Sequence, residues 1–148
     1  MLKELIIAFG IMGLCLVIHI SGMVMLGDRL VRRRKTIEHG GPLSAALLLI
    51  AVFVIIIILH LTAAALWAVF YLWYGLFKDF ETSLYFSLTC YSTVGYGDVL
   101  LPDSWRLLGT VEAISGALLC GLSTAFLFAI INVMFRFRVQ QLMKRHLI

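Results

Sequence analysis

The chain has 148 residues, of which 62% are hydrophobic and only 14% are charged, and its formal net charge is +4. Ordinary soluble domains are about 45–50% apolar and about 25% charged, so this apolar excess cannot be buried in a soluble domain of such size. The composition therefore excludes an ordinary soluble domain and predicts an all-α membrane protein. Because the basic residues cluster at the ends of apolar runs, the positive charge does not indicate nucleic-acid binding.

Three cysteines lie singly inside apolar runs: Cys15, Cys90 and Cys120. This spacing indicates neither a disulfide framework nor a metal cluster. The sequence also shows no nucleophile–base arrangement and no nucleotide-binding loop. We therefore expect no enzymatic activity and no cofactor.

The first apolar run covers residues 5–26 and is long enough, as a helix, to cross about 30 Å of hydrocarbon. A cleaved signal peptide is the alternative, but the run is too long for a typical signal core and no A-x-A-like site follows it. We therefore predict a retained transmembrane helix within residues 1–27. His19 lies inside this run, and we expect it to be a hydrogen-bonded packing residue.

Residues 28–44 form a polar connector that is rich in basic side chains. Short loops rich in Lys and Arg stay in the cytoplasm, and we expect Arg32, Arg33 and Arg34 to contact anionic lipid headgroups. A voltage sensor would need cations at every third position of a membrane helix. Contiguous arginines in a loop do not fit that pattern.

Residues 45–77 are almost wholly apolar and predict an outer transmembrane helix, with Gly41-Pro42 marking its start. His60, near the middle of this run, is again expected to pack. Aromatic side chains crowd the far end, which is typical of a belt at the membrane interface. They are Trp67, Tyr71, Trp73 and Tyr74.

Residues 82–92 alternate polar with aromatic or aliphatic side chains. As a helix this segment reaches only about 16 Å, which is too short to span a bilayer. The length suits a re-entrant pore helix that enters from the outer side. Non-helical backbone beyond it is tolerated at membrane depth only where it is buried in protein or lines a wet cavity.

The hexapeptide 93–98, Thr-Val-Gly-Tyr-Gly-Asp, supplies such a segment. A potassium ion sheds its water only if other oxygens replace it, and backbone carbonyls aimed at one axis can do so. An extended ribbon with all carbonyls on one side alternates between ordinary and left-handed backbone, and Gly95 and Gly97 fall at alternate positions. An ordinary extracellular turn is the alternative, but it leaves the flanking pore helix and the long apolar helices unexplained.

The last apolar run, residues 107–135, predicts an inner helix, and residues 136–148 form a basic tail. The basic connector and tail are both expected in the cytoplasm, which places the pore loop and the N-terminus outside. The C-terminus is then cytoplasmic. We therefore predict a multi-pass protein of the plasma membrane or the bacterial inner membrane.

Residues 45–135 resemble the pore domain of P-loop potassium channels, with outer helix, pore helix, filter and inner helix in that order. The resemblance implies three transmembrane helices with a re-entrant pore helix and filter loop in each chain, and a homotetrameric pore. It also implies that four residues coordinate K⁺ and that two more support the filter. The coordinating residues are Thr93, Val94, Gly95 and Tyr96, and the supporting residues are Gly97 and Asp98.

Three features depart from the minimal family pattern. The helix in residues 1–27 is additional to the two-helix pore. Thr89 stands where some members carry a glutamate that braces the filter aspartate, so the bracing must differ. Glu112 lies in the inner helix, where a carboxylate is costly and usually has a partner or a task. Three interpretations of Glu112 stay open. The carboxylate could brace the filter from behind, it could accept hydrogen bonds from hydroxyls of the pore helix, or it could be a protonated carboxyl with a local partner.

The inner helix contains two candidates for the glycine hinge that the family commonly carries, Gly116 and Gly121. Close helix packing is the alternative for both glycines. Counting from them, Cys120 and Thr124 face the pore axis and line a wet cavity below the filter. Phe128, one turn deeper, either forms a hydrophobic constriction or packs against a neighbouring helix.

The leading hypothesis is a homotetrameric channel that passes K⁺ passively down its electrochemical gradient. A poorly selective cation channel is one alternative, although Tyr96 favours K⁺ selectivity. A non-conducting membrane subunit that recruits a cytosolic partner is the other.

Overall fold

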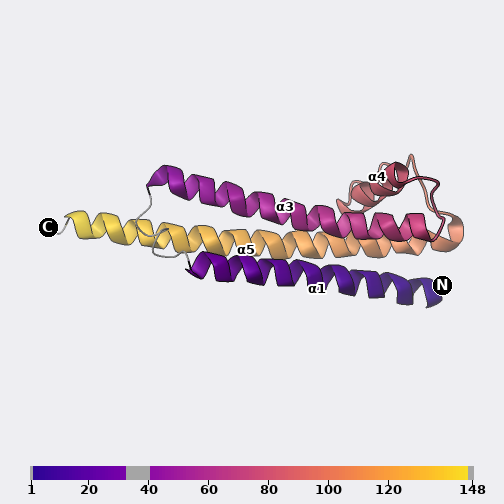
Figure 1. The fold of residues 1–148 in the computed structure, drawn as a ribbon, viewed down its shortest axis with the longest axis horizontal. Helices are drawn as coiled ribbons and strands as arrows, with labels where there is room; N and C mark the ends of the chain where they lie inside the picture. The colour runs from indigo at the N-terminus through magenta and orange to yellow at the C-terminus, as the bar shows by residue number, and fades with distance from the viewer. Residues whose placement is uncertain (1, 33–40, 147–148) are drawn as a thin grey trace.

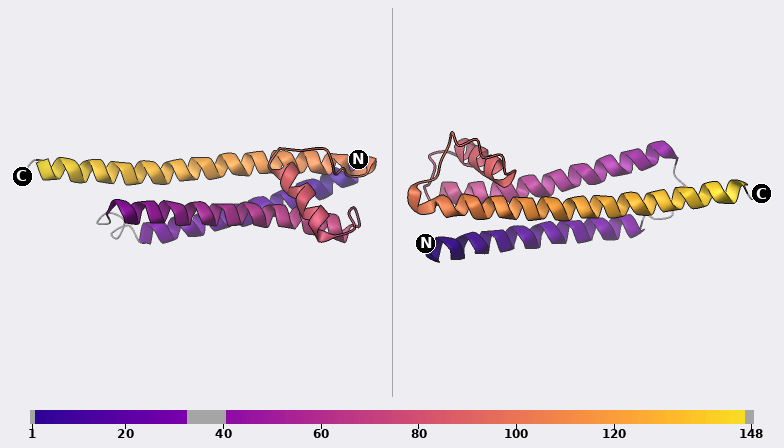
Figure 2. Two further views of the ribbon diagram at one scale, coloured as in Figure 1. Left: turned by 90° about the horizontal axis from the view of Figure 1, so that it is seen from above. Right: turned by 180° about the vertical axis from the view of Figure 1, so that it is seen from behind.

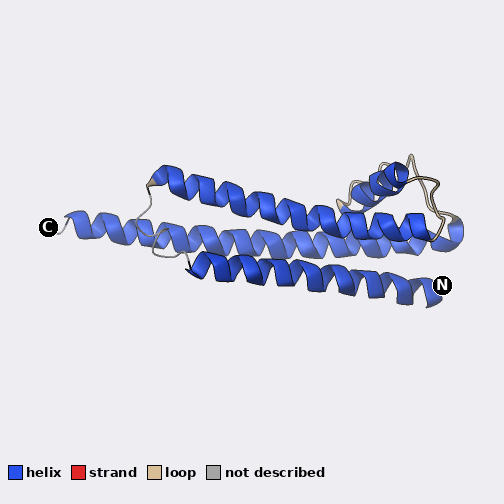
Figure 3. Ribbon diagram, in the orientation of Figure 1, coloured by secondary structure: helices blue, strands red, loops and turns tan. Residues whose placement is uncertain are grey.

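The computed structural model describes residues 2–32 and 41–146 (Figure 1). Within these ranges every regular element is helical (Figure 3). Three of the helices are long and apolar enough to cross a membrane, which confirms the predicted all-α membrane fold. In chain order the elements are α1 (Leu2–Arg32), α3 (Pro42–Trp73), α4 (Phe80–Tyr91), the short 3-10 helix η1 (Asp103–Trp105) and α5 (Arg106–His146).

The three long helices run lengthwise beside one another, and α1 packs against both α3 and α5 (Figure 2). The short α4 lies at one end of this bundle, where it contacts α3 and α5. The N-terminus lies at the same end as α4, and the C-terminus lies at the opposite end (Figure 1). This arrangement agrees with the predicted order of crossings, while the side of the membrane that each end faces stays a prediction.

The helix α3 starts at Pro42, three residues before the predicted residue 45 and at the Gly41-Pro42 signal, and it ends at Trp73 rather than at residue 77. Gly75 adopts a left-handed φ of +72°, and its N–H donates to Leu72 O at 3.0 Å. The next N–H, from Leu76, donates to Tyr71 O at 2.9 Å. These two bonds form a Schellman motif, which satisfies the last carbonyls and stops the helix.

Two other helices are longer than predicted. Helix α1 continues to Arg32, so the first part of the expected connector is helical, and its terminal arginines suit the negative end of the helix dipole. Arg33 and Arg34 lie outside the described residues. Helix α5 continues to His146 rather than ending at 135, because the basic segment contains good helix formers and neither Gly nor Pro.

The best-packed region is the half of the bundle that contains α4. Buried residues from all four α-helices meet there, among them Ala8, Leu108 and Tyr91. Trp67 and Tyr71 are completely buried in this cluster, so the prediction that they belong to an interfacial belt is wrong. Their neighbours Trp73 and Tyr74 are exposed, as that prediction requires. Trp67 and Tyr71 belong to the cluster shared by all four α-helices, where the Tyr71 ring packs edge-on against Phe86 of α4, and Trp73 and Tyr74 lie outside it.

Candidate functional site

The site begins at the N-terminus of α4, which Asp79 caps. The Asp79 carboxylate accepts a hydrogen bond from the Thr82 backbone N–H at 2.7 Å and another from the Thr82 hydroxyl at 2.9 Å. These two bonds, the backbone one first, lower the pKa of Asp79 below its ordinary value. An acidic cap of this kind satisfies free N–H groups and suits the positive end of the helix dipole. The helix therefore starts at Phe80, two positions before the predicted residue 82.

The backbone of the filter segment alternates as the sequence analysis predicted. Gly95 has φ +52° and Gly97 has φ +79°, and nothing lies within 4 Å of a Cβ built on either residue. Thr93 also adopts a positive φ of +62°, which was not predicted. Left-handed backbone in a β-branched residue costs on the order of 1–3 kcal/mol and is concentrated at functional sites. The three left-handed residues stand at every second position.

Two backbone hydrogen bonds tie this ribbon to the end of α4. The Thr93 N–H donates to Cys90 O at 2.9 Å, and the Gly95 N–H donates to Thr89 O at 2.9 Å. The position of the filter therefore follows the position of the last turn of α4. The sequence analysis considered only the side chain of Thr89 and did not foresee that its carbonyl accepts a filter N–H.

Tyr85 is the residue that holds the filter aspartate, and sequence reasoning missed it. Its hydroxyl donates to the Asp98 carboxylate at 2.7 Å. Thr89 instead donates to Phe86 O in its own helix at 2.9 Å. The available signal was the position of Tyr85 one turn before Thr89, on the same face of α4. This bond is the largest cause of the lowered pKa of Asp98.

Glu112 is completely buried and joins three helices. It accepts a hydrogen bond from the Tyr71 hydroxyl of α3 at 2.6 Å, and its other carboxyl oxygen is hydrogen-bonded to the Ser87 hydroxyl of α4. Ser87 also lies 2.7 Å from the carbonyl of Ala64 on α3. Both partners belong to helices and neither to residues 93–98, so the structure supports hydrogen bonding to a hydroxyl of α4 rather than direct bracing of the filter. A protonated carboxyl satisfied locally agrees with the same contacts.

The inner helix is continuous past both predicted hinge glycines. A Cβ at Gly116 would overlap the carbonyl oxygen of Tyr91, so this glycine permits close contact between α5 and the end of α4. Nothing lies within 4 Å of a Cβ at Gly121. The contact favours the packing interpretation for Gly116, and a hinge at either position stays a prediction.

The predicted cavity face of α5 is exposed in the single chain. Cys120, Thr124 and Phe128 are all exposed, and the Thr124 hydroxyl donates to Cys120 O at 2.9 Å. Exposure is what a face toward a central cavity would show before other subunits assemble. The cavity and the constriction at Phe128 stay predictions.

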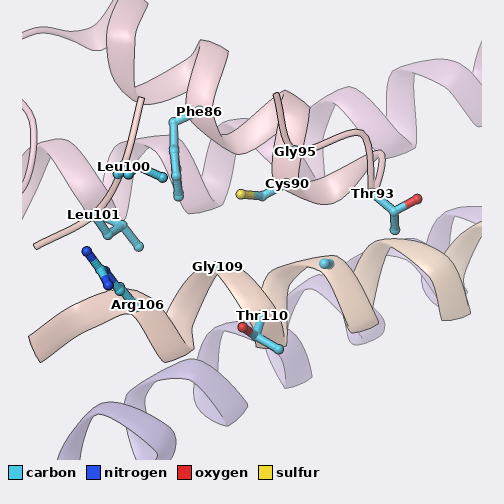
Figure 4. A pocket seen from close by; sticks show the side chains of 10 residues that line it. Phe86, Cys90, Thr93, Gly95, Leu100, Leu101, Arg106, Gly109 and Thr110 are labelled. Atoms are coloured by element: carbon cyan, nitrogen blue, oxygen red, sulfur yellow. The ribbon is translucent and has the colours of Figure 1, made fainter. Parts of the chain in front are cut away.

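An open pocket of about 430 Å³ separates the filter segment from the first turns of α5 (Figure 4). Phe86 and Cys90 enter it from α4, and Arg106 and Thr110 lie on its α5 side. Thr93 and Gly95 also contribute to its lining. In a single chain, the first turns of α5 therefore do not pack tightly against the whole length of the filter segment.

The filter side chains are also uncovered in the single chain: Val94 is 53% exposed and Tyr96 is 72% exposed. In a filter whose carbonyls face the axis, we expect both side chains to point away from that axis into surrounding protein. A single chain covers little of either side chain.

The comparison with protein families agrees with this geometry. A family model described as "Ion channel" matches residues 46–133, which contain α4, the filter segment and most of α3 and α5. No curated protein and no solved structure matches the chain.

Proposed function

The chain belongs to the ion channel family, and from that premise we propose that it is a potassium-selective channel that conducts K⁺ passively through a homotetrameric pore. The observation that carries the proposal is the alternation of left-handed backbone at Thr93, Gly95 and Gly97. In a ribbon of this kind successive carbonyls can face one side. Such a row replaces the hydration shell of a cation without any charged ligand.

The proposed ligands are the oxygens of four consecutive residues, Thr93, Val94, Gly95 and Tyr96. Carbonyl oxygens carry partial charges, so an ion is held at several sites weakly enough to leave again. Helix α4 ends just before this row, and its C-terminal end favours a cation beyond it. These features together suit conduction rather than tight storage of the ion.

The shape of one chain supports the proposed tetramer. A single ribbon covers one side of an ion, so several copies must meet on an axis to surround it. The exposure of Val94 and Tyr96 supports this assembly, because apolar and aromatic side chains beside a filter need protein around them. The exposed face of α5 that contains Thr124 would then line the cavity below the filter.

The test is reconstitution of the purified chain in liposomes, followed by K⁺ flux and by reversal potentials with K⁺ on one side and Na⁺ on the other. We expect K⁺ flux and a reversal potential close to that of a K⁺-selective membrane. Gly95→Ala should abolish selective flux, because Ala tolerates the left-handed backbone poorly. Gly10→Ala is the matched control, since Gly10 is helical and nothing lies within 4 Å of its added Cβ.

Three results would contradict the proposal. Equal permeability of K⁺ and Na⁺ would indicate a non-selective cation channel. Absence of any flux from a well-folded assembly would indicate a non-conducting subunit. A monomer or dimer as the conducting species would exclude the tetrameric filter.

A further inference from the structure

A chain of hydrogen-bonded polar side chains, three of them buried and one half-buried, connects α1 with the end of α4. His19 Nε2 of α1 lies 2.8 Å from Ser123 Oγ of α5, and the same oxygen lies 3.1 Å from His60 Nε2 of α3. His60 Nδ1 lies 2.8 Å from the hydroxyl of Tyr91, the last residue of α4. All four α-helices thus contribute one member each.

Three of these groups are buried inside the protein, and His60 is half-buried. His19 is 1% exposed, Ser123 is 3% exposed and Tyr91 is 5% exposed. The two imidazole rings lie 4.7 Å apart between centroids, and the His60 ring also contacts the Tyr91 ring edge-on. Polar groups at this depth are costly unless they are hydrogen-bonded to one another. Four such groups from four helices therefore specify one relative placement of those helices.

The links can all be made with every member neutral. In one arrangement the Tyr91 hydroxyl donates to His60 Nδ1, His60 Nε2–H donates to Ser123 Oγ, and the Ser123 hydroxyl donates to His19 Nε2. With the other tautomer of both histidines, all three bonds run in the opposite direction. Each side chain is therefore hydrogen-bonded to the next one in the chain. Removing one member therefore leaves its neighbour unpaired in an apolar environment.

The end of this chain is the residue on which the filter depends. Tyr91 is held at its hydroxyl by His60, and its backbone carbonyl lies directly against Gly116 of α5. Two residues later Thr93 starts the left-handed alternation. The carbonyl of Thr89, in the same last turn, accepts the Gly95 N–H. A rotation of this turn would displace both filter residues.

We infer that α1 is a positioning element for the filter: His19, through Ser123 and His60, fixes Tyr91 and with it the last turn of α4. His19 and His60 are therefore more than the packing residues that the sequence analysis expected. The inference rests on the proposed function, because it assigns these residues to the geometry of a potassium filter. It also gives a task to the helix that is additional to the two-helix pore.

The experiment compares three single variants of the full chain, reconstituted as the assembled protein: Tyr91→Phe, Ser123→Ala and His19→Leu. The first two remove only an oxygen atom, so they test the idea even if His19→Leu fails to assemble. We expect the Na⁺-to-K⁺ permeability ratio to rise about fivefold in each, the factor that corresponds to about 1 kcal/mol for one hydrogen bond. His19→Gln, which keeps a donor and an acceptor, should restore most of the wild-type ratio.

Thr62→Val is the matched control. Thr62 is exposed on α3, close in sequence to His60, and its hydroxyl donates only to Ile58 O of its own helix at 2.8 Å. This variant should leave the permeability ratio unchanged. A role in packing alone would lower thermal stability equally in K⁺ and in Na⁺ without changing the ratio, whereas a role in positioning should reduce the extra stability that K⁺ provides.

The double variant His19→Leu/Tyr91→Phe distinguishes a connected chain from independent effects. The two residues share no direct hydrogen bond, so separate roles would give additive changes. A connected chain predicts that the double variant is no less selective than the worse single variant. The inference is overturned if a K⁺-selective wild type gives variants that match Thr62→Val. A wild type that does not distinguish K⁺ from Na⁺ overturns the proposed function instead.

Discussion

The hydroxyl of Tyr85 donates a 2.7 Å hydrogen bond to the carboxylate of Asp98, and so joins α4 to the last residue of the proposed filter, residues 93–98. Tyr85 precedes residues 93–98 in the sequence, and Asp98 is the last residue of that segment. The bond closes a loop that contains the whole filter, from its first residue Thr93 to Asp98. Both side chains are exposed in the single chain, so water competes for this contact.

Removing the Tyr85 hydroxyl should shorten the lifetime of the conducting state. In Tyr85→Phe the ring remains, but Asp98 loses a hydrogen bond to its charged form, and the filter loses its outer attachment. We expect currents to decay several-fold faster during sustained conduction, while the K⁺ reversal potential at the start is unchanged. Planar-bilayer recording measures both quantities.

Tyr74→Phe is the control for this variant. Tyr74 is exposed near the same end of the bundle, and its ring packs edge-on against Trp105 at 4.6 Å between centroids, a contact that Phe retains. Equal decay rates in Tyr85→Phe and wild type would show that the bond does not support the filter.

The dependence on external pH follows from Asp98. Its pKa is lowered from an ordinary value of 3.8, first by the hydrogen bond from Tyr85. A carboxyl with a lowered folded-state pKa contributes stability that is complete above the unfolded value and is lost as the pH falls through the folded value. Currents should therefore persist down to the region of pH 3.8 and decline below it. In Tyr85→Phe the decline should begin at higher pH, and a decline at the same pH in both proteins would contradict this account.

We expect the protein to keep its thermal stability when Glu112 is replaced by glutamine and to lose stability when it is replaced by leucine. Ser87 has one proton and two acceptors within reach, so a protonated Glu112 that donates to Ser87 satisfies every group. Glutamine can make the same contacts, and we expect Glu112→Gln to change thermal stability little. Leucine leaves the buried Tyr71 hydroxyl unpaired, at a cost of about 1–3 kcal/mol. Thermal unfolding of the purified assembly separates the two variants, and a leucine variant as stable as the glutamine one would refute the prediction.

Gly116→Ala should disturb the end of the pore helix. The added Cβ would overlap the Tyr91 carbonyl, which belongs to backbone and cannot move aside without displacing the last turn of α4. We expect a loss of assembled protein or of K⁺ selectivity, measured by size-exclusion chromatography and reversal potential. Gly121→Ala should be neutral or slightly stabilising in the chromatographic assay, because its Cβ meets nothing and Ala favours helix. The same behaviour of both variants would exclude the packing role of Gly116.

Much of the site could be predicted from local pattern. The order of two long apolar helices around a short polar one indicated a pore loop, and alternate glycines indicated left-handed backbone at Gly95 and Gly97. The helix ends were less predictable: α3 stops at a Schellman motif around Gly75, and α5 continues through a basic segment expected to be a separate tail. Hydrophobicity indicates which residues lie in the membrane. Capping and helix propensity instead determine the residue at which a helix ends.

The sequence by itself determined that the protein has helices apolar enough to cross a membrane and that Gly95 and Gly97 take left-handed backbone, because apolar length and glycine spacing act within a few residues of the chain. Only the tertiary structure decided which polar side chains meet. The bond between Tyr85 and Asp98, the burial of Glu112 against Tyr71, and the route from His19 to Tyr91 all join separate elements. A polar residue inside an apolar run predicts that its side chain has a hydrogen-bond partner. Which residue is that partner depends on how the helices pack.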